Sequence, residues 1–530
     1  MKEKVLKEYN LFKAWLTREK IMAFLVTFLV GFITHIKLIV GLFSNQDGLW
    51  EGMQYQKLGA WQVALGRWGI VLAERLNNFI LIPSVATITA ILFISIASVF
   101  LIDLLSIKNK ISIIITSISM VVGPSVMLTF LYINTSMAYA LAFLVSIMSV
   151  WFLYRFKSKK IGFIISMLLT IFALSIYQSY IGVVAGLAIM YIVVNILKNN
   201  MSIKEALIDV LKMIVIVIVG TILYYIISNI IVKIMGTNFS TYNNADNLSI
   251  SAVFLNAFPM LKTTYVKFFD YYFRDNIIWN TNYRRDILYT CFYIVLFIIF
   301  IARLIKLEKG EKKDKVLKCI LTVVLIAILP AALNSINIIL GRDCIYEITS
   351  TQLILVIPFV LALAEGLFEL NVLYILGMVV IVPILMTYYI ADNVSYTTIE
   401  MTYKQSEYEV LKIMARIESM EEYNNGMKIL LAGIIDDENA PRYSNLYNFG
   451  YGVGSNNTVF HGDYAGQKST WIRFLEVVCG TRINMPDDEQ YKRIVESDEF
   501  KELGIYPDMD SIEVIEDCIV VRLKRFPAVP

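Results

Sequence analysis

Two long apolar runs separated by a short basic loop decide the fold of this chain. Residues 83–105 read PSVATITAILFISIASVFLIDLL, and residues 111–131 read ISIIITSISMVVGPSVMLTFL. Each run has the roughly 20 mostly apolar residues that an α-helix needs to cross a bilayer. The loop between them carries Lys108 and Lys110, so the pair has the form of two membrane-spanning helices joined at a charged surface.

The composition of the whole chain supports a membrane protein. Of its 530 residues, 57% are hydrophobic and 17% are charged, whereas soluble domains are about 45–50% apolar and about 25% charged. With 26 Gly, 11 Pro and 5 Cys, the composition excludes disordered, collagen-like and disulfide-rich proteins. A formal net charge of +3 argues against a nucleic-acid-binding protein.

Nine further segments pass the same test of length and apolarity. Since none alternates like a strand of a lipid-exposed barrel, the sequence predicts an α-helical polytopic membrane protein with about 11 transmembrane helices. The predicted spans are 21–43, 83–105, 111–131, 136–154, 161–177, 180–197, 211–232, 287–305, 316–340, 351–367 and 372–391.

Lysines and arginines cluster on alternate loops, and this pattern sets the predicted orientation. Basic loops stay in the cytoplasm, so the N-terminus is predicted to be cytoplasmic, with residues 1–20 as an amphipathic anchor. The transmembrane domain then covers 21–391 and sends two long loops, 44–82 and 233–286, to the external side. An odd number of spans places the C-terminus outside, in a multi-pass protein of the plasma membrane.

The composition changes after residue 392 and predicts a small extracytoplasmic α/β domain over 392–530. KILLAGII (428–435) reads as a buried strand, and SIEVIEDCIVVRLKR (511–525) reads as a β-hairpin. Cys479 and Cys518 lie in this domain, and their spacing alone does not decide whether they pair.

Ionisable side chains are scarce in the middle of the predicted spans, which argues against an ion-coupled transporter. Asp103 and Glu365 lie near cytoplasmic ends, where we expect them to reach water. His35 and Lys37 lie in the outer half of the first span. Lys37 either snorkels to the external headgroups or faces the bundle and holds an anionic group such as a lipid phosphate.

The predicted external segments gather acids, arginines and aromatic residues, a combination that suits phosphates and sugar rings. Helix capping and interfacial anchoring are the alternative interpretations of the same residues. The candidates are Asn45, Gln46 and Asp47 directly after the first span, Arg67 in GRW, Tyr177 and Gln178 in a tight turn, Asp270 in the aromatic-rich loop, and Arg342 and Asp343 in GRDCIYE.

The sequence also limits the chemistry. Nucleotide-binding glycine motifs and the HExxH zinc motif are absent, and the chain has 2 His. What remains is a reaction whose substrate arrives through the bilayer. Transfer of a sugar from a polyprenyl phosphate is such a reaction. The leaving phosphate needs a cation, and the acceptor hydroxyl needs a carboxylate base at the interface.

Three segments resemble the bacterial polytopic glucosyltransferases typified by the serotype-converting O-antigen glucosyltransferases, which are of the GT-C kind. They are NQD (45–47) followed by GRWG (66–69), LSIYQSYIG (174–182), and SDEFKELGIYPDMDSIEVIEDCIVVRL (497–523). The family more often carries a pair of acids after the first span, whereas this chain has Gln46 before Asp47.

This resemblance implies transfer of a hexose, usually glucose, from a polyprenyl-phosphate donor to a surface polysaccharide at the bacterial plasma membrane. Asp47 becomes the expected general base, with Arg67, Arg342 and, more weakly, Lys37 at the donor phosphate. The remaining candidates are expected to contact substrate, and they are Asn45, Gln46, Tyr177, Gln178, Asp270 and Asp343. No metal is required because arginines can offset the phosphate charge, although Asp270, Asp275 and Asp343 leave room for a divalent cation.

Two other functions stay open from the sequence. A flippase for polysaccharide or lipid-linked sugar would need charges along a central path, which the spans lack. A polysaccharide polymerase would also have many spans and a large external loop, and 233–286 suits that role.

Overall fold

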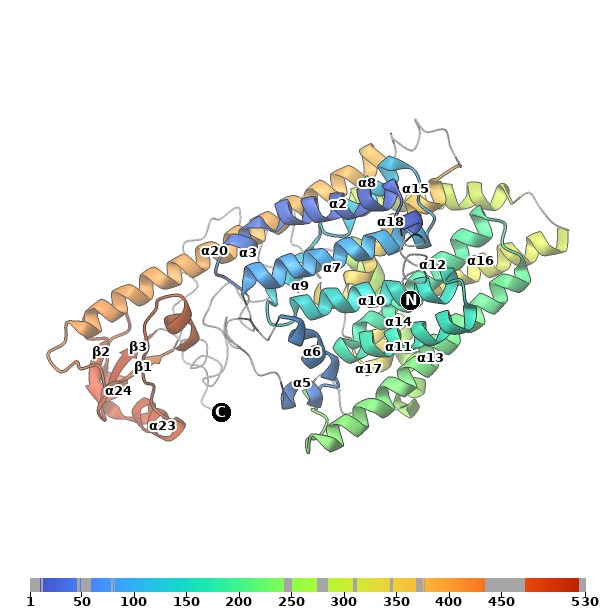
Figure 1. Cartoon of the computed structure of the whole chain (residues 1–530). Coiled ribbons are helices and arrows are strands. Elements are labelled where there is room, and N and C mark those ends of the chain that lie inside the picture. Colours follow the sequence, from blue (N-terminus) through green and yellow to red (C-terminus); the bar gives the residue numbers. More distant parts are fainter. Residues whose placement is uncertain are drawn as a thin grey trace.

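A computed structural model of the chain shows a long helical bundle with a small α/β unit at one end (Figure 1). It describes residues 10, 13–44, 48, 59–77, 80, 82–242, 250–273, 285–307, 312–343, 347–367, 375, 377–433 and 472–523. Within these residues, eight helices are long and apolar enough to cross a membrane, or nine if one bent pair counts as a single span. The protein is therefore a helical membrane protein, and the exact number of spans stays a prediction.

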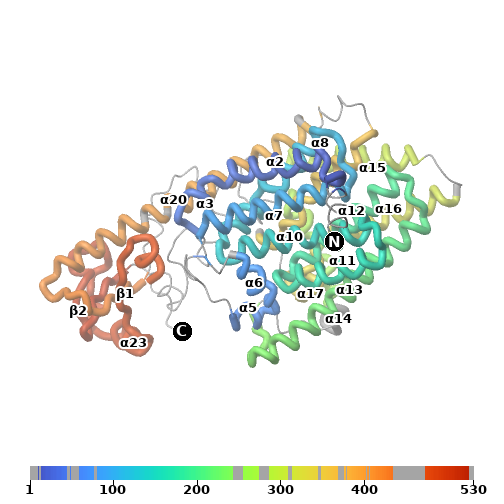
Figure 2. Tube along the Cα trace, in the orientation of Figure 1, coloured from blue at the N-terminus to red at the C-terminus, as the bar shows by residue number. Residues whose placement is uncertain are grey.

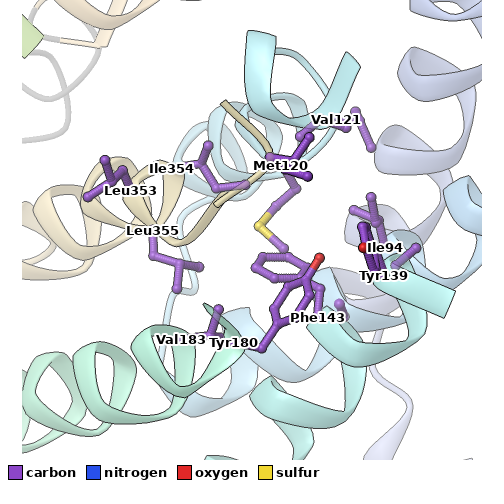
Figure 3. Packing of buried hydrophobic residues seen from close by; sticks show 14 of the residues in the cluster. Ile94, Met120, Val121, Tyr139, Phe143, Tyr180, Val183, Leu353, Ile354 and Leu355 are labelled. Carbon is purple, nitrogen blue, oxygen red and sulfur yellow. The ribbon is translucent and has the colours of Figure 1, made fainter. Parts of the chain in front are cut away.

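The helices follow one another in the order that the apolar runs indicate. Those that make up the bundle are α2 (Arg18–Thr34), α3 (Ile36–Val40), α7 (Pro83–Leu104), α8 (Lys110–Ser119), α9 (Pro124–Leu131), α10 (Ser136–Arg155), α11 (Lys159–Ile176), α12 (Ile181–Lys198), α13 (Ile203–Ile234), α14 (Ile250–Phe273), α15 (Arg285–Ile305), α16 (Lys312–Leu333), α17 (Ile336–Leu340), α18 (Val356–Ala364) and α20 (Val382–Glu418). The core lies where α7, α8, α10 and α12 meet the 3₁₀ segment Thr351–Leu355, and Figure 3 shows Met120, Tyr139, Phe143 and Tyr180 packed there.

Two of the predicted spans are broken rather than continuous. The run 111–131 forms α8 and α9, which meet at 44°, because Pro124 cannot continue the hydrogen-bond ladder of α8 and Gly123 adopts φ +150°. The run 21–43 ends α2 at Thr34 and restarts as α3 after His35.

The segment predicted as the external loop 233–286 contains a long helix, α14. α14 packs against α15, α16 and α17, and its aromatic side chains Phe268, Tyr271 and Tyr272 are buried. Tyr272 donates a hydrogen bond to the Leu353 carbonyl oxygen at 2.9 Å. These aromatic rings therefore pack in the protein core rather than standing free for sugars or the interface.

Glu365 does not reach water, contrary to the sequence prediction. Its side chain is 8% exposed and forms an ion pair with Lys198 at 3.0 Å. It also accepts hydrogen bonds from the backbone N–H groups of Lys108 and Asn109 at 2.8–3.1 Å. Asp103 is 21% exposed and pairs with Lys20 at 2.7 Å. Carboxylates with so little exposure require partners, and here the partners lie in segments remote in the sequence, Lys20 in α2 and Lys198 in α12.

α20 leaves the bundle and connects it to the C-terminal sheet (Figures 1 and 2). It runs without a break across the predicted domain boundary at 392. Beyond it, the sheet has the order β1-β3-β2, with β1 (Lys428–Ala432) parallel to β3 (Cys518–Arg522) and β2 (Ile512–Ile515) antiparallel to β3. The predicted strand and hairpin are confirmed.

The C-terminal unit has its own small core. Helices α23 (Asp488–Glu496) and α24 (Asp498–Glu502) supply Tyr491, Ile494 and Phe500, which pack with Leu430 and Val520 of the sheet. Cys479 and Cys518 are both free thiols. Burial raises the pKa of Cys518 to about 12 and that of Cys479 to about 11.

Candidate active site

The candidate site is built on two short helices joined by a tight turn. α5 (Ala60–Ala64) precedes the turn, and α6 (Trp68–Ala73) follows it. Gly66 makes the turn at φ +72°, a left-handed conformation that glycine adopts at little cost. α6 packs against α10 and α11, while α5 packs against α13. The turn thereby presents Arg67 to the ends of three bundle helices that the sequence places on the external side.

Arg67 lies over a stack of two tyrosine rings. Its guanidinium carbon is 4.5 Å from the centre of the Tyr177 ring, a cation–π distance. Tyr177 also stacks on Tyr139 of α10, with 4.8 Å between ring centres and 17° between planes. Tyr177 is buried and Arg67 is half-buried, so a planar cation is held on an aromatic platform with part of its surface accessible.

Gln178 fixes the turn that carries Arg67. Its Nε2 donates hydrogen bonds to the Leu65 carbonyl and to the Tyr224 hydroxyl, both at 2.8 Å. The Tyr224 hydroxyl donates in turn to the Gly66 carbonyl at 3.1 Å. Both side chains are buried, so this network ties the backbone directly before Arg67 to the 3₁₀ segment Gln178–Tyr180 and to α13.

The structure brings Arg342 to the same region but pairs Asp343 with a lysine. Both residues follow α17, whose Ile339 packs in one cluster with Tyr224. Arg342 is exposed, while Asp343 forms an ion pair with Lys267 of α14 at 2.7 Å. Asp270 lies one turn further along α14 and is half-exposed.

Lys37 belongs to a different set of contacts. Its ammonium group forms an ion pair with Glu400 of α20 at 3.2 Å, with side-chain exposures of 35% and 32%. The positive charge of Lys37 is thus matched by a carboxylate of the protein, on a helix separate from those that hold Arg67.

Asn45, Gln46 and Asp47 lie outside the described residues, but residues on both sides of them are described. Ser44 is buried at the end of the first span. A Cβ on Gly48 would lie 2.8 Å from the Ser44 hydroxyl and 2.8 Å from Ile133. The two flanks of the segment are therefore close together and contact the turn that precedes α10.

The segment from Ile133 to Tyr139 connects these two parts of the protein. Ile133 contacts Gly48, and Tyr139, one turn into α10, supports the Tyr177 ring beneath Arg67. The exit of the first span and the arginine turn thus both contact the short segment Ile133–Tyr139.

Comparison with known families assigns the chain. The family model described as "Glucosyl transferase GtrII" matches residues 51–363, which is more than half of the chain. This protein belongs to the GtrII glucosyl transferase family. No curated protein and no solved structure matches the chain.

The match confirms the family that the sequence resembles and makes the protein a glycosyltransferase of the membrane. In this GtrII protein, the matched residues include Arg67, Tyr177, Gln178 and Arg342. They exclude the first span, Asp47, α20 and the C-terminal sheet.

Two residues of this GtrII site, Tyr139 and Tyr224, do not stand out in the sequence. Both lie inside predicted spans, where a tyrosine counts as part of an apolar stretch. The available signal was the phenol hydroxyl, because a buried tyrosine hydroxyl usually finds a polar partner. Among the residues that the structure describes, no group of three or more His, Cys, Asp or Glu side chains could hold a metal ion.

Proposed function

We propose that this protein transfers a glucosyl unit from a polyprenyl-phosphate donor to a surface polysaccharide, in the GT-C manner, on the external side of the bacterial plasma membrane. The GtrII family supports glucosyl transfer, and the apolar helices support a lipid-linked donor. The external side is the side opposite the lysine-rich loops.

The reaction exchanges one bond at the anomeric carbon. The Asp47 carboxylate accepts the proton of an acceptor hydroxyl, and that oxygen forms a bond to C1 of the donor glucose. The bond between C1 and the phosphate oxygen breaks, and the electron pair leaves with the polyprenyl phosphate. Arg67 donates hydrogen bonds to the phosphate oxygens, where negative charge develops in the transition state.

The cation–π contact between Arg67 and Tyr177 is the observation that carries this proposal. A guanidinium has five N–H donors in a rigid plane and matches phosphate geometry. The cation–π contact with Tyr177 restrains the guanidinium group, and the Gln178 network holds the backbone directly before Arg67. Arg342 is the second cation on this face, with Asn45, Gln46, Asp270 and Asp343 as the remaining expected substrate contacts.

Membranes supplied with labelled polyprenyl-phosphate glucose and acceptor polysaccharide test the proposal. We expect label to reach the polymer one residue at a time. Growth of long chains would indicate a polymerase, and label that only crosses the bilayer would indicate a flippase.

The substitution Asp47→Asn tests the proposed base. It should leave the protein inserted and lower turnover by about 10²-fold or more, the scale of general-base catalysis. Asp498→Asn is the matched control, because the Asp498 side chain is 94% exposed in the C-terminal unit. Full activity in Asp47→Asn would mean that Asp47 is a helix cap rather than the base.

A further inference from the structure

One face of α20 carries four polar side chains that all bond to the first span or to a break in the bundle. The four are Asp392, Tyr396, Glu400 and Tyr403, spaced by four, four and three residues. Positions at these spacings line one face of a helix. We name this set the α20 polar face.

The outermost contact holds the chain directly before Asn45. The Tyr403 hydroxyl donates a hydrogen bond to the Ser44 carbonyl at 3.1 Å, and the Ser44 backbone N–H donates to the same hydroxyl at 3.3 Å. Tyr403 is 7% exposed. Its ring packs between Phe43 of the first span and Phe474 of the C-terminal unit, at 6.3 and 5.7 Å.

The next contact is the ion pair between Glu400 and Lys37. An exposed pair like this one contributes little stability by itself. Its position matters more, because it lies between the Tyr403 contact and the Tyr396 contact and keeps α3 in register with α20.

The other two side chains of the α20 polar face, Tyr396 and Asp392, form hydrogen bonds where bundle helices are interrupted. Nε2 of His35 is 2.8 Å from the Val121 carbonyl, which can only accept, so Nε2 carries the proton and Nδ1 accepts from the Tyr396 hydroxyl at 2.7 Å. Asp392 accepts from the Gly123 N–H at 3.0 Å. His35, Tyr396 and Asp392 are all 0% exposed.

This arrangement is more specific than helix packing requires. Apolar side chains would pack α20 on the bundle without the cost of burying a carboxylate, an imidazole and phenol hydroxyls. Each of these buried groups instead bonds at a point where the backbone departs from a helix, at Ser44, Val121 or Gly123, or at His35, where α2 ends. Hydrogen bonds are directional, whereas apolar packing is not. The α20 polar face therefore fixes where the first span ends as well as burying it.

We infer that the α20 polar face holds the exit of the first span, at Ser44, in place for the transfer reaction, with Tyr403 as the principal positioning residue. This inference rests on the proposed function, because it assigns the task of these contacts to the segment that bears Asp47. It also gives Lys37 a different role from the one that the sequence suggested, since its charge serves Glu400 rather than the donor phosphate.

Tyr403→Phe tests the inference, because it keeps the ring against Phe43 and Phe474 and removes the hydroxyl. We expect kcat for glucosyl transfer to fall about tenfold while KM for the donor changes less than twofold, since the base and not the donor site is displaced. Tyr408→Phe is the matched control, as Tyr408 lies on the same helix and is 66% exposed. An unchanged kcat in Tyr403→Phe would overturn the inference.

Reversing the Lys37–Glu400 charges gives a second test. Lys37→Glu and Glu400→Lys should each lower kcat, and the double variant should recover most of it, because the ion pair is restored in the opposite sense. If Lys37 instead binds the donor phosphate, the double variant stays as low as Lys37→Glu alone, and the role assigned to the pair is wrong.

Hydrogen exchange separates this inference from the proposed function. The peptide covering residues 38–50 should take up deuterium several-fold faster in Tyr403→Phe than in the parent protein, with no substrate present. Unchanged uptake refutes the positioning contact whatever reaction the protein catalyses. If Asp47→Asn is fully active, the proposed base fails while the exchange result still decides whether Tyr403 holds the segment.

Discussion

Replacing Gly66 with alanine should break the hydrogen bonds by which Gln178 and Tyr224 hold the turn before Arg67. Gly66 has φ +72°, where a side chain is strained. An added Cβ would also lie 2.5 Å from the Tyr224 hydroxyl and 3.2 Å from Nε2 of Gln178. Both polar groups have to move, and they are the groups that hold the Leu65 and Gly66 carbonyls directly before Arg67.

The magnitude follows from two terms. The left-handed conformation costs alanine about 1–2 kcal/mol. Displacing the Tyr224 hydroxyl disrupts two hydrogen bonds, each worth about 0.5–1.5 kcal/mol, so the total destabilisation is about 2–5 kcal/mol. A shift of about 1 Å at Arg67 should lower transfer by about 10²-fold, because the phosphate contact depends on its geometry.

Gly236→Ala is a matched control. Gly236 also has a left-handed backbone, at φ +63°, but its added Cβ would meet no atom within 4 Å. This variant isolates the backbone term, so it should lose about 1–2 kcal/mol and keep its transfer rate.

The assay compares the two alanine variants in membranes and after purification. Initial rates of glucosyl transfer report on Arg67, and the temperature of half-inactivation reports on stability. Equal rates and equal inactivation temperatures in Gly66→Ala and Gly236→Ala would refute the claim that the Gln178–Tyr224 network positions the arginine.

Two other results are expected. Arg67→Lys should lower kcat at least about tenfold with little change in donor KM, because an ammonium group neither stacks on Tyr177 nor offers a planar set of donors. Arg482→Lys is the control, since its side chain is 90% exposed. An unchanged rate in Arg67→Lys would remove Arg67 from the site. Burial raises the pKa of Cys479 to about 11, so its reactive thiolate is scarce at pH 8, and its alkylation by iodoacetamide, followed by peptide mass spectrometry, should accelerate about tenfold per pH unit up to pH 10. A rate that levels off near pH 9 would mean that the thiol has an ordinary pKa.

Hydropathy was sufficient for the helices that are continuous and apolar. The runs 83–105, 136–154 and 287–305 agree with α7, α10 and α15 to within one or two residues, because length and apolar content alone define a spanning helix. The break in 111–131 was available in the sequence as Gly123-Pro124, since proline disrupts a helix interior. α14 was missed because its charged and polar residues dilute the apolar face that packs against α15, α16 and α17.

The residues of the arginine turn could be proposed from the sequence, but their partners could not. Arg67, Tyr177 and Gln178 stood out as polar groups in predicted external turns. The contact from Gln178 to Tyr224 spans 46 residues, and that from Tyr224 to Gly66 spans 158. Contacts at such separations depend on how helices pack, and periodicity along one helix does not encode the identity of its neighbour.

The proposed reaction needs two groups, and only one of them lies within the residues that match the family model. The proposed phosphate-binding residue Arg67 and its partners Tyr177 and Gln178 lie within the residues that match the GtrII family. The proposed base and the α20 polar face lie outside them, on either side of the matched region. Ile133 contacts the flank of Asp47, while Tyr139 stacks on Tyr177, so the span exit and the arginine turn both contact the stretch Ile133–Tyr139. The position of Arg67 and the position of the proposed base are therefore expected to respond to different substitutions, Gly66→Ala for the first and Tyr403→Phe for the second.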